Sequence, residues 1–363
     1  MREEVREDHA QHSLSFNPGK QGMESVMKRL TRSETTKETK MISRVHRMFG
    51  SMALFAGLAL SLLAVQPAAA ATDINSCPFV IATPGQYRVA NDLVSALPGA
   101  CITIQANDVH LNLRGHTITG PTNCQTPFIG VVPSTGIVVG AVSNVHINNG
   151  TVGGGFQEGI RLNGTMDSHV NDMLVTQNCL FGIRLVGAMH NSFHAITVEL
   201  TANPPVHCAG YRLDSSNGNV ITSNKVLRGG EAAFDDTGIE LFTSNSNTIQ
   251  STEVSDNIAD GIQLLANSDS NVVRSNTVTN NQGHGIQAGP SSDRNLIQAN
   301  KVTGSSGSGI YLQLGATFNT VEANTALGNG VVLGFDGQDD NPACDNNDWD
   351  SNNFGTTNQP CVQ

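Results

Sequence analysis

The chain has 363 residues, with 20 Lys and Arg against 31 Asp and Glu, so its formal net charge at pH 7 is −11. This acidic balance argues against nucleic acid or an anionic membrane as the partner of the whole surface. Aromatic residues make up 5% of the chain, with a single Trp, which disfavours ring stacking on neutral, cellulose-like sugars and favours charged ones.

The first 71 residues are expected to lie outside the folded domain. Residues 1–40 are polar and without periodicity, so they are a disordered extension or follow a mis-assigned start. Residues 41–71 have the pattern of a secretory signal, in which an apolar run over 49–65 precedes an alanine-rich cleavage site near Ala70 or Ala71. A retained membrane anchor is the alternative, because the apolar run approaches spanning length. We expect a secreted, periplasmic or cell-surface protein without membrane contact after cleavage.

Residues 72–342 contain a repeat in which glycine is followed by isoleucine, or once by tyrosine, at intervals of 23 to 28 residues. Each copy reads Gly-Ile-x-Leu or close to it, which is the alternation of a strand with one buried face. A unit this short cannot close its own core, so the copies must stack. The pattern predicts an all-β solenoid of about nine coils of 21–28 residues, with one repeat glycine per coil: Gly136, Gly159, Gly182, Gly210, Gly238, Gly261, Gly285 and Gly309.

A column of asparagines supports this register, because each lies seven residues before a small apolar residue. Asparagine tolerates left-handed backbone angles and can bond to the asparagine of the next coil in a stack. We therefore predict an Asn ladder with a structural role, formed by Asn219, Asn247, Asn271, Asn295 and Asn319.

Seven cysteines in an exported chain indicate disulfides, with at least one thiol left over. Cys344 and Cys361 bracket the end of the stack, and we expect them to close a C-terminal cap over residues 343–363. Closing a loop of that size contributes about 3 kcal/mol in the chain-entropy account. Pairing of Cys77 with Cys101, and of Cys179 with Cys208, is also consistent with the register, and other pairings stay open.

The Gly-Ile-x-Leu and Asn-x-(Ile/Val) pattern resembles the right-handed parallel β-helix proteins of the pectate-lyase-like superfamily. The resemblance covers about residues 75–342 and includes the opening motifs Val109-His110-Leu111 and Arg114-Gly115-His116. It implies the fold. Proteins of this group include lyases, hydrolases, epimerases, surface binding proteins and a periplasmic protein of copper-enzyme maturation, so the resemblance does not select a reaction.

The residue after each isoleucine should point outward, and on three consecutive coils it is Arg161, Arg184 and Arg212, followed by Glu240. Guanidinium groups about 4.8 Å apart repel one another unless acids or an anionic ligand lie among them. One interpretation is a stripe that binds the carboxylates of a uronate polymer. The other is local neutralisation by Glu158, Asp214 and Glu240.

The two coils next to this stripe are lengthened, over residues 201–209 and 228–237. Inserted loops on one side of a solenoid commonly shape its binding face. They supply His207, Asp235 and Asp236, which we consider as acid or base candidates. The alternative is that the two aspartates form a solvated turn and that His207 is an ordinary loop histidine.

Gly283-His284-Gly285 is similar to the Gly-His-Gly of polygalacturonases, and Asp235-Asp236 to the paired aspartates of that family. Asp235 lies 49 residues before His284, which is two coils where the family pattern would need one. Gly285 is also a repeat glycine, so chance explains much of the match. Asp260 occupies the same column one coil earlier and could orient His284, which keeps His284 as a catalytic candidate.

The sequence predicts an exported β-helix that recognises an acidic, uronate-containing polysaccharide. Cleavage or epimerisation is a further expectation and would make it a polysaccharide lyase, glycoside hydrolase or uronate epimerase. The alternative is a non-catalytic surface or periplasmic scaffold or adhesion protein. We expect a monomer that needs no cofactor, although the acidic tail offers oxygen ligands that could hold calcium: Asp336, Asp339, Asp340, Asp345, Asp348 and Asp350.

Overall fold

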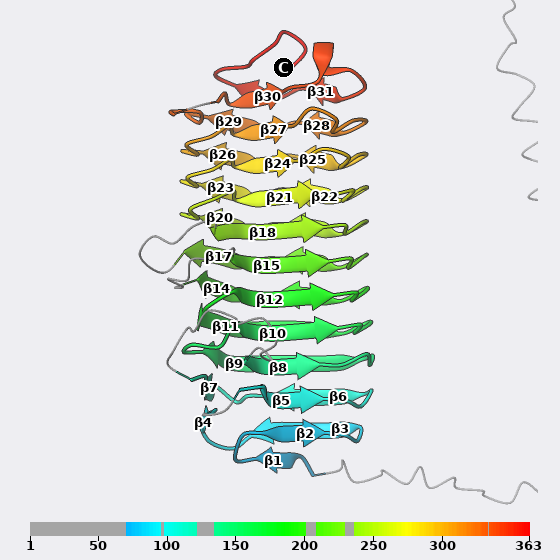
Figure 1. The fold of residues 1–363 in the computed structure, drawn as a ribbon, viewed down its shortest axis with the longest axis vertical. Helices are drawn as coiled ribbons and strands as arrows, with labels where there is room; N and C mark the ends of the chain where they lie inside the picture. Colours follow the sequence, from blue (N-terminus) through cyan, green and yellow to red (C-terminus); the bar gives the residue numbers. More distant parts are fainter. Residues whose placement is uncertain (1–69, 96–97, 122–133, 201–207, 229–235, 333) are drawn as a thin grey trace, which may run out of the picture. The chain divides into compact units, whose positions relative to one another are not determined.

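The computed structural model describes residues 70–95, 98–121, 134–200, 208–228, 236–332 and 334–363. These residues form stacked coils of short parallel strands, and Figure 1 shows the strands of successive coils lying one above the other. The described residues contain one short 3-10 helix, η1 (Pro342–Cys344). No helix in these ranges is long and apolar enough to cross a membrane. The expected signal over 41–71 lies almost entirely outside the described residues.

One sheet takes a single strand from each coil and has eleven parallel strands. Two of them precede the first repeat glycine, so the stack begins earlier than the Gly-Ile pattern. In order, the strands are β2 (Phe79–Ile81), β5 (Ala100–Ile104), β8 (Thr135–Val139), β10 (Glu158–Asn163), β12 (Phe181–Val186), β15 (Cys208–Asp214), β18 (Asp236–Phe242), β21 (Ile262–Leu265), β24 (Ile286–Ala288), β27 (Ile310–Leu312) and β30 (Gly337–Asp339).

The remaining strands form a second sheet, to which most coils contribute two segments. These strands are β1 (Thr72–Ile74), β3 (Gly85–Val89), β4 (Leu93–Val94), β6 (Val109–Asn112), β7 (Thr117–Thr119), β9 (Val145–Gly153), β11 (His169–Asn178), β13 (Ser192–His194), β14 (Thr197–Leu200), β16 (Val220–Thr222), β17 (Lys225–Arg228), β19 (Thr248–Gln250), β20 (Glu253–Ser255), β22 (Val272–Arg274), β23 (Thr277–Thr279), β25 (Leu296–Gln298), β26 (Lys301–Thr303), β28 (Thr320–Glu322), β29 (Thr325–Leu327), β31 (Asp348–Asp350) and β32 (Asn353–Phe354).

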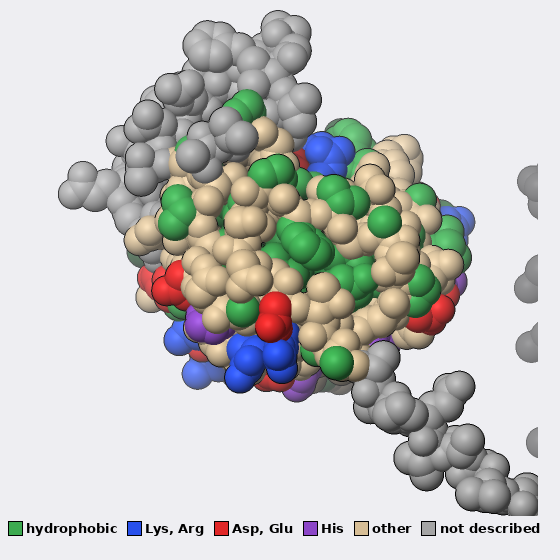
Figure 2. All heavy atoms as spheres, turned by 90° about the horizontal axis from the view of Figure 1, so that it is seen from below, with side chains coloured by type: hydrophobic (Ala, Val, Ile, Leu, Met, Phe, Trp, Pro, Cys, Tyr) green, Lys and Arg blue, Asp and Glu red, His purple; other side chains and the backbone are tan. Residues whose placement is uncertain are grey.

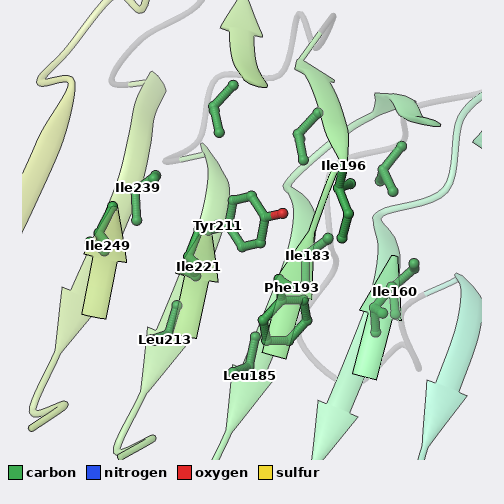
Figure 3. Packing of buried hydrophobic residues seen from close by; sticks show 14 of the residues in the cluster. Ile160, Ile183, Leu185, Phe193, Ile196, Tyr211, Leu213, Ile221, Ile239 and Ile249 are labelled. Atoms are coloured by element: carbon green, nitrogen blue, oxygen red, sulfur yellow. The ribbon is translucent and has the colours of Figure 1, made fainter. Parts of the chain in front are cut away.

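The isoleucine of each repeat points into the core, where it packs on the isoleucines of the coils above and below. Ile160 pairs with Ile183, and Ile239 with Ile262, in registers that keep each column in line. All four side chains are fully buried, and Figure 3 shows the first three of them along the stack. The period-two pattern therefore specifies this sheet because every second side chain faces the same dry interior.

The repeat glycines are required by space rather than by backbone angle. A Cβ atom placed on Gly261 would lie 2.6 Å from Cγ1 of Val278 and 2.7 Å from the carbonyl oxygen of Gly285 in the next coil. The same two kinds of neighbour recur at Gly182, Gly210, Gly238 and Gly285. Each glycine therefore lets the sheet backbone approach the valine of the opposing strand.

Tyr211 takes the isoleucine position in the first lengthened coil, between Ile183 and Ile239 (Figure 3). Its ring is fully buried and packs edge-on against Phe193 at 5.8 Å between ring centroids. Its hydroxyl is buried and finds no hydrogen-bond partner in the described part of the chain.

Replacing Tyr211 by Phe should raise the free energy of unfolding by about 1 kcal/mol, because it removes a buried hydroxyl that makes no bond. The measurement is the denaturant midpoint of the variant against that of the wild type. A clear loss of stability would show that the hydroxyl does have a partner in the folded protein.

The predicted Asn ladder is confirmed, and it extends beyond the predicted residues. The backbone N–H of Asn219 donates to Oδ1 of Asn247 at 2.9 Å, and its side-chain Nδ2 donates to the same oxygen at 3.1 Å. These paired bonds repeat up to Asn319 and then reach Asn347 of the cap. A second ladder runs through Asn276, Asn300, Asn324 and Asn352. The buried turns are thus satisfied by side chains from neighbouring coils.

Disulfides join Cys77 to Cys101 and Cys344 to Cys361. Cys179 is also disulfide-bonded, whereas Cys208 keeps its thiol and donates to the backbone carbonyl oxygen of Cys179 at 3.2 Å. The suggested Cys179–Cys208 pairing is therefore wrong, although the two residues do lie on adjacent coils. Cys124 falls outside the described residues.

The C-terminal end of the stack contains two buried carboxylates, next to core residues such as Trp349 and Val362. Asp339 takes the interior leucine position of β30 and is fully buried, pairing in register with Leu312. Its oxygens accept four N–H donors from Asn341, Asn347 and Trp349 at 2.7–3.0 Å. Asp336 likewise accepts from Asn329, Gly355 and Thr356.

These contacts give Asp336 and Asp339 structural roles, because their oxygens are directed to N–H and hydroxyl donors. Within the described ranges, no three His, Cys, Asp or Glu side chains gather as a metal site. The tail residues proposed as calcium ligands therefore do not converge on one point in these ranges.

The N-terminal end of the stack, seen in Figure 2, has apolar side chains at its centre and charged side chains towards the rim. Val80 of β2 and Val94 of β4 belong to the first coils and are 54% and 70% exposed.

Candidate functional site

The outward column of the eleven-stranded sheet contains the predicted arginines on three adjacent rungs. Arg161 pairs in register with Arg184, Arg184 with Arg212, and Arg212 with Glu240. The column continues in register through Gln263, Gln287, Tyr311 and Gln338. We call these eight residues, from Arg161 to Gln338, the outer stripe.

Acidic side chains lie between the arginines of the outer stripe. Glu158 Oε1 lies 2.9 Å from Nη1 of Arg184, and Glu158 Oε2 lies 3.5 Å from Nη1 of Arg161. Asp214 bridges the next gap, with its two oxygens 2.9 Å from Nε of Arg184 and 2.7 Å from Nε of Arg212. Glu240 forms a close ion pair with Arg212. Three carboxylates thus neutralise three guanidinium groups, as the local-neutralisation interpretation expected.

The members of this network differ in their access to solvent. The side chains of Glu158 and Glu240 are 1% and 3% exposed, whereas Asp214 is 19% exposed. The three arginines are between 15% and 30% exposed. Burial acts to lower the pKa of Arg184. Its ion pairs with Glu158 and Asp214 raise the pKa by more than burial lowers it, so the net shift is upward.

Two phenylalanines that the sequence reasoning missed support the arginines. The guanidinium carbon of Arg184 lies 5.0 Å from the ring centroid of Phe181, and that of Arg212 lies 4.9 Å from Phe242. These are cation–π distances. Phe242 is 39% exposed, so part of an aromatic ring is available beside the stripe. The signal in the sequence was the alternation itself, which places Phe242 two residues after Glu240 on the same face.

Two of the three candidates from the lengthened coils, His207 and Asp235, lie outside the described residues. Asp236 begins β18, is 1% exposed and pairs in register with Cys208. His284 belongs to the coil of β24, two coils further along, which is about 10 Å of stacking. The structure therefore does not bring Asp236 and His284 into contact.

His284 is held by two hydrogen bonds, one to its ring and one to its backbone. Its Nδ1 accepts the backbone N–H of Ser308 at 2.9 Å, and its own backbone N–H donates to Oδ1 of Asp260 at 2.6 Å. Asp260 thus holds the backbone of His284. Burial lowers the pKa of His284, although the nearby Asp340 carboxylate acts to raise it. A neutral imidazole whose Nδ1 accepts must carry its proton on Nε2.

This tautomer makes His284 a hydrogen-bond donor towards any ligand. Its ring lies 4.6 Å from that of Tyr311, centroid to centroid, and the Tyr311 hydroxyl donates to Asp340 at 2.5 Å. A hollow of about 480 Å³ lies beside it, lined by Gln282, Gly283, His284, Ser306, Gly307 and Val332.

A separate group of histidines lies on the second sheet. The rings of His110 and His146 stack at 4.4 Å, and His169 follows at 4.8 Å from His146. Burial, and then the charges of His110 and His169, lower the pKa of His146. His146 pairs in register with His110 and with His169, so the three histidines occupy adjacent rungs.

Three solved structures illustrate the similarity of fold. The Dettilon tailspike protein aligns with TM-score 0.53 and 16% identity over 77% of this chain, and this chain spans 54% of the tailspike chain. The A-module of mannuronan C-5 epimerase AlgE4 from Azotobacter vinelandii aligns with TM-score 0.50 and 16% identity, covering 78% of this chain and 88% of that one.

DFA-IIIase from Arthrobacter chlorophenolicus A6, without its lid, aligns with TM-score 0.52 and 12% identity, covering 72% of this chain and 81% of that one. At these identities the likeness shows the fold alone. No curated protein sequence matches the chain.

The model of a protein family described as "Right handed beta helix region" matches residues 135–326, which is more than half of the chain. The match spans the strands from β8 to β29 except the last residue of β29, and it includes the three stripe arginines. The chain therefore belongs to the right-handed β-helix family.

Proposed function

We propose that this protein is exported and binds an acidic, uronate-containing polysaccharide along the outer stripe. The observation that supports this most is the unbroken column of hydrogen-bonding side chains from Arg161 to Gln338. Seven steps of about 4.8 Å make it about 34 Å long. A straight column with a fixed repeat suits a linear polymer whose own polar groups recur at regular intervals.

The arginine half of the outer stripe favours a carboxylate-bearing sugar. The side chains of Arg184 and Arg212 are 30% and 15% exposed, and a planar guanidinium matches a carboxylate through paired N–H donors. Phe242 adds a partly exposed ring beside them, which can cover the apolar side of a sugar. Further along, the half-buried Gln263 can bond hydroxyl groups, whereas Gln287 is 4% exposed and accepts from Nε2 of Gln263 at 3.0 Å.

Export is supported by the two disulfides, at Cys77–Cys101 and Cys344–Cys361, which persist in oxidising compartments. The proposed location is the periplasm, the cell surface or the medium.

Replacing Arg184 by Ala should weaken binding to polygalacturonate or alginate by about tenfold, which corresponds to the loss of one charge-assisted contact. Calorimetry or a retention assay with the two polymers measures this. Arg274→Ala is the matched control, because Arg274 is also an arginine but lies in β22 of the other sheet. Unchanged binding by the Arg184 variant would place the ligand elsewhere.

Cleavage and epimerisation are tested on the same polymers with the full chain. Unsaturated uronate absorbance detects a lyase, reducing ends detect a hydrolase, and exchange of the C5 proton with solvent detects an epimerase. The acid and base roles of His207, Asp235, Asp236 and His284 stay predictions. For His284 we propose hydrogen-bond donation through Nε2, because its Nδ1 lone pair is engaged by Ser308.

The second candidate is a non-catalytic exported scaffold or adhesion protein. It is favoured by the mutual neutralisation of the stripe, where the three arginines already have carboxylate partners. This candidate predicts neither product release nor proton exchange with any acidic polysaccharide, and no effect of Arg184→Ala on retention.

A further inference from the structure

Asp214 occupies a special position among the three carboxylates of the outer stripe. It ends β15 and is the acid shared by the Nε atoms of Arg184 and Arg212, at 2.9 and 2.7 Å. Each guanidinium also holds a second acid, Glu158 for Arg184 and Glu240 for Arg212. Asp214 therefore joins Arg184 to Arg212 within a chain of six alternating charges that runs from Arg161 to Glu240.

The two outer acids, Glu158 and Glu240, are more deeply buried than Asp214. Glu158 and Glu240 are 1% and 3% exposed, and exposing a buried carboxylate would require the surrounding strands to open. Asp214 is 19% exposed, and its side-chain oxygens make hydrogen bonds only with the two arginines among the described residues. Ser215, the next residue, has a left-handed φ of 48°, so the chain turns away directly after Asp214.

The residues that pair in register with Asp214 on the adjacent strands do not stabilise its negative charge. Val186 precedes it and Phe242 follows it in register, and neither side chain offers a hydrogen-bond donor. The carboxylate thus lies between two guanidinium groups, has apolar side chains on its flanking rungs and is partly exposed. A carboxylate from outside could make the same two N–H contacts and could also pack against Phe242.

We infer that the gap between Arg184 and Arg212 is a carboxylate-binding slot that the Asp214 side chain fills in the unbound protein. Building on the proposed function, a uronate carboxylate would bind there by displacing Asp214 from the two Nε–H donors. Asp214 then acts as an internal competitor, which keeps the stripe neutral without ligand and sets how tightly an acidic polymer binds.

The first test uses acetate and does not depend on any polysaccharide. The Asp214→Ala substitution empties the slot and removes the acid that Arg184 and Arg212 share. Acetate should therefore bind there, so the thermal unfolding midpoint of this variant should be higher in acetate than in the same concentration of chloride. Wild type should show no such difference. Asp350→Ala is the control, because it changes the net charge equally and lies exposed in β31 of the other sheet.

The second test compares oligogalacturonate binding by calorimetry. Asp214→Ala should bind about tenfold more tightly than wild type, and Asp214→Asn, which keeps one acceptor oxygen but no charge, should lie between them. The asparagine variant also provides the answer if the alanine variant does not fold, as judged by near-ultraviolet circular dichroism.

The outcomes separate the slot from the proposed function. Acetate stabilisation of Asp214→Ala without oligogalacturonate binding by any variant supports the slot and overturns the polysaccharide proposal. Absence of acetate stabilisation in both Asp214 variants overturns the slot. Weaker oligogalacturonate binding by both Asp214 variants than by wild type would overturn the competitor role, because Asp214 would then be part of the ligand contact.

Discussion

Replacing Gly261 by Ala is expected to lower the free energy of unfolding by about 3 kcal/mol, the upper part of the range for overpacked cores. The new Cβ would lie 2.6 Å from Cγ1 of Val278, 2.7 Å from the carbonyl oxygen of Gly285 and 2.8 Å from Nδ2 of Asn281. Two of these neighbours belong to the next coil, so relief requires the coils to separate. That separation would weaken the sheet hydrogen bonds and the Asn257–Asn281 contact at 2.8 Å.

The matched control is Gly140→Ala, which adds the same methyl group to another glycine of the stack. Its Cβ would meet only the carbonyl oxygen of Ile104, at 3.4 Å. We expect a change within about 1 kcal/mol. Denaturant midpoints followed by circular dichroism measure both variants. Equal effects at the two positions would show that close packing between coils is not the reason for the repeat glycine.

Replacing Asp339 by Ala should cost about 4 kcal/mol and loosen the C-terminal cap. The change removes a fully buried carboxylate, and with it the acceptor of the Asn341 backbone N–H and of Nε1 of Trp349. Nδ2 of Asn341 and Nδ2 of Asn347 lose one bond each but keep the carbonyl oxygen of Ala316 as an acceptor. Each bond to a charged group contributes about 1.5–3 kcal/mol, and local relaxation recovers part of the total. Because Trp349 is the single tryptophan of the chain, its fluorescence reports on the cap directly.

In this experiment the fluorescence transition of Trp349 should occur at lower denaturant than in wild type and ahead of the circular dichroism transition. Coils of a solenoid contact only their neighbours, so an end can open before the rest. Asp350→Ala is the control, since Asp350 is exposed beside Trp349. Coincident and unshifted transitions in Asp339→Ala would mean that the carboxylate does not hold the cap.

The outer stripe illustrates how far the chemistry of a site depends on its surroundings. Alignment on the repeat glycines placed Arg161, Arg184 and Arg212 on adjacent rungs, and the sheet register agrees. The alignment could not decide whether the guanidinium groups face ligand or protein. In the structure, Asp214 reaches both Arg184 and Arg212 from the end of its own strand. The charge of the stripe follows from these side-chain distances.

The histidine candidate shows the same dependence. The sequence placed His284 one residue before a repeat glycine, with Asp260 one coil below. Which ring nitrogen is available for chemistry depends on where Ser308, a residue of the next coil, points its backbone N–H. Likewise, the sequence offered Asp336 and Asp339 as oxygen ligands, and their burial against N–H donors became visible only with the cap in place.

The sequence by itself determined the parallel β-helix, its register and the Asn ladder, because in a solenoid every coil repeats the same local rules and stacking turns spacing along the chain into position in space. The expected Cys344–Cys361 disulfide is also present. Only the tertiary structure decided that Cys179 and Cys208 do not pair, why the repeat residue must be glycine and which charges on the outer stripe cancel. Those properties depend on distances of a few ångströms between side chains of different coils, and interactions at that range change sign or strength with small differences in placement.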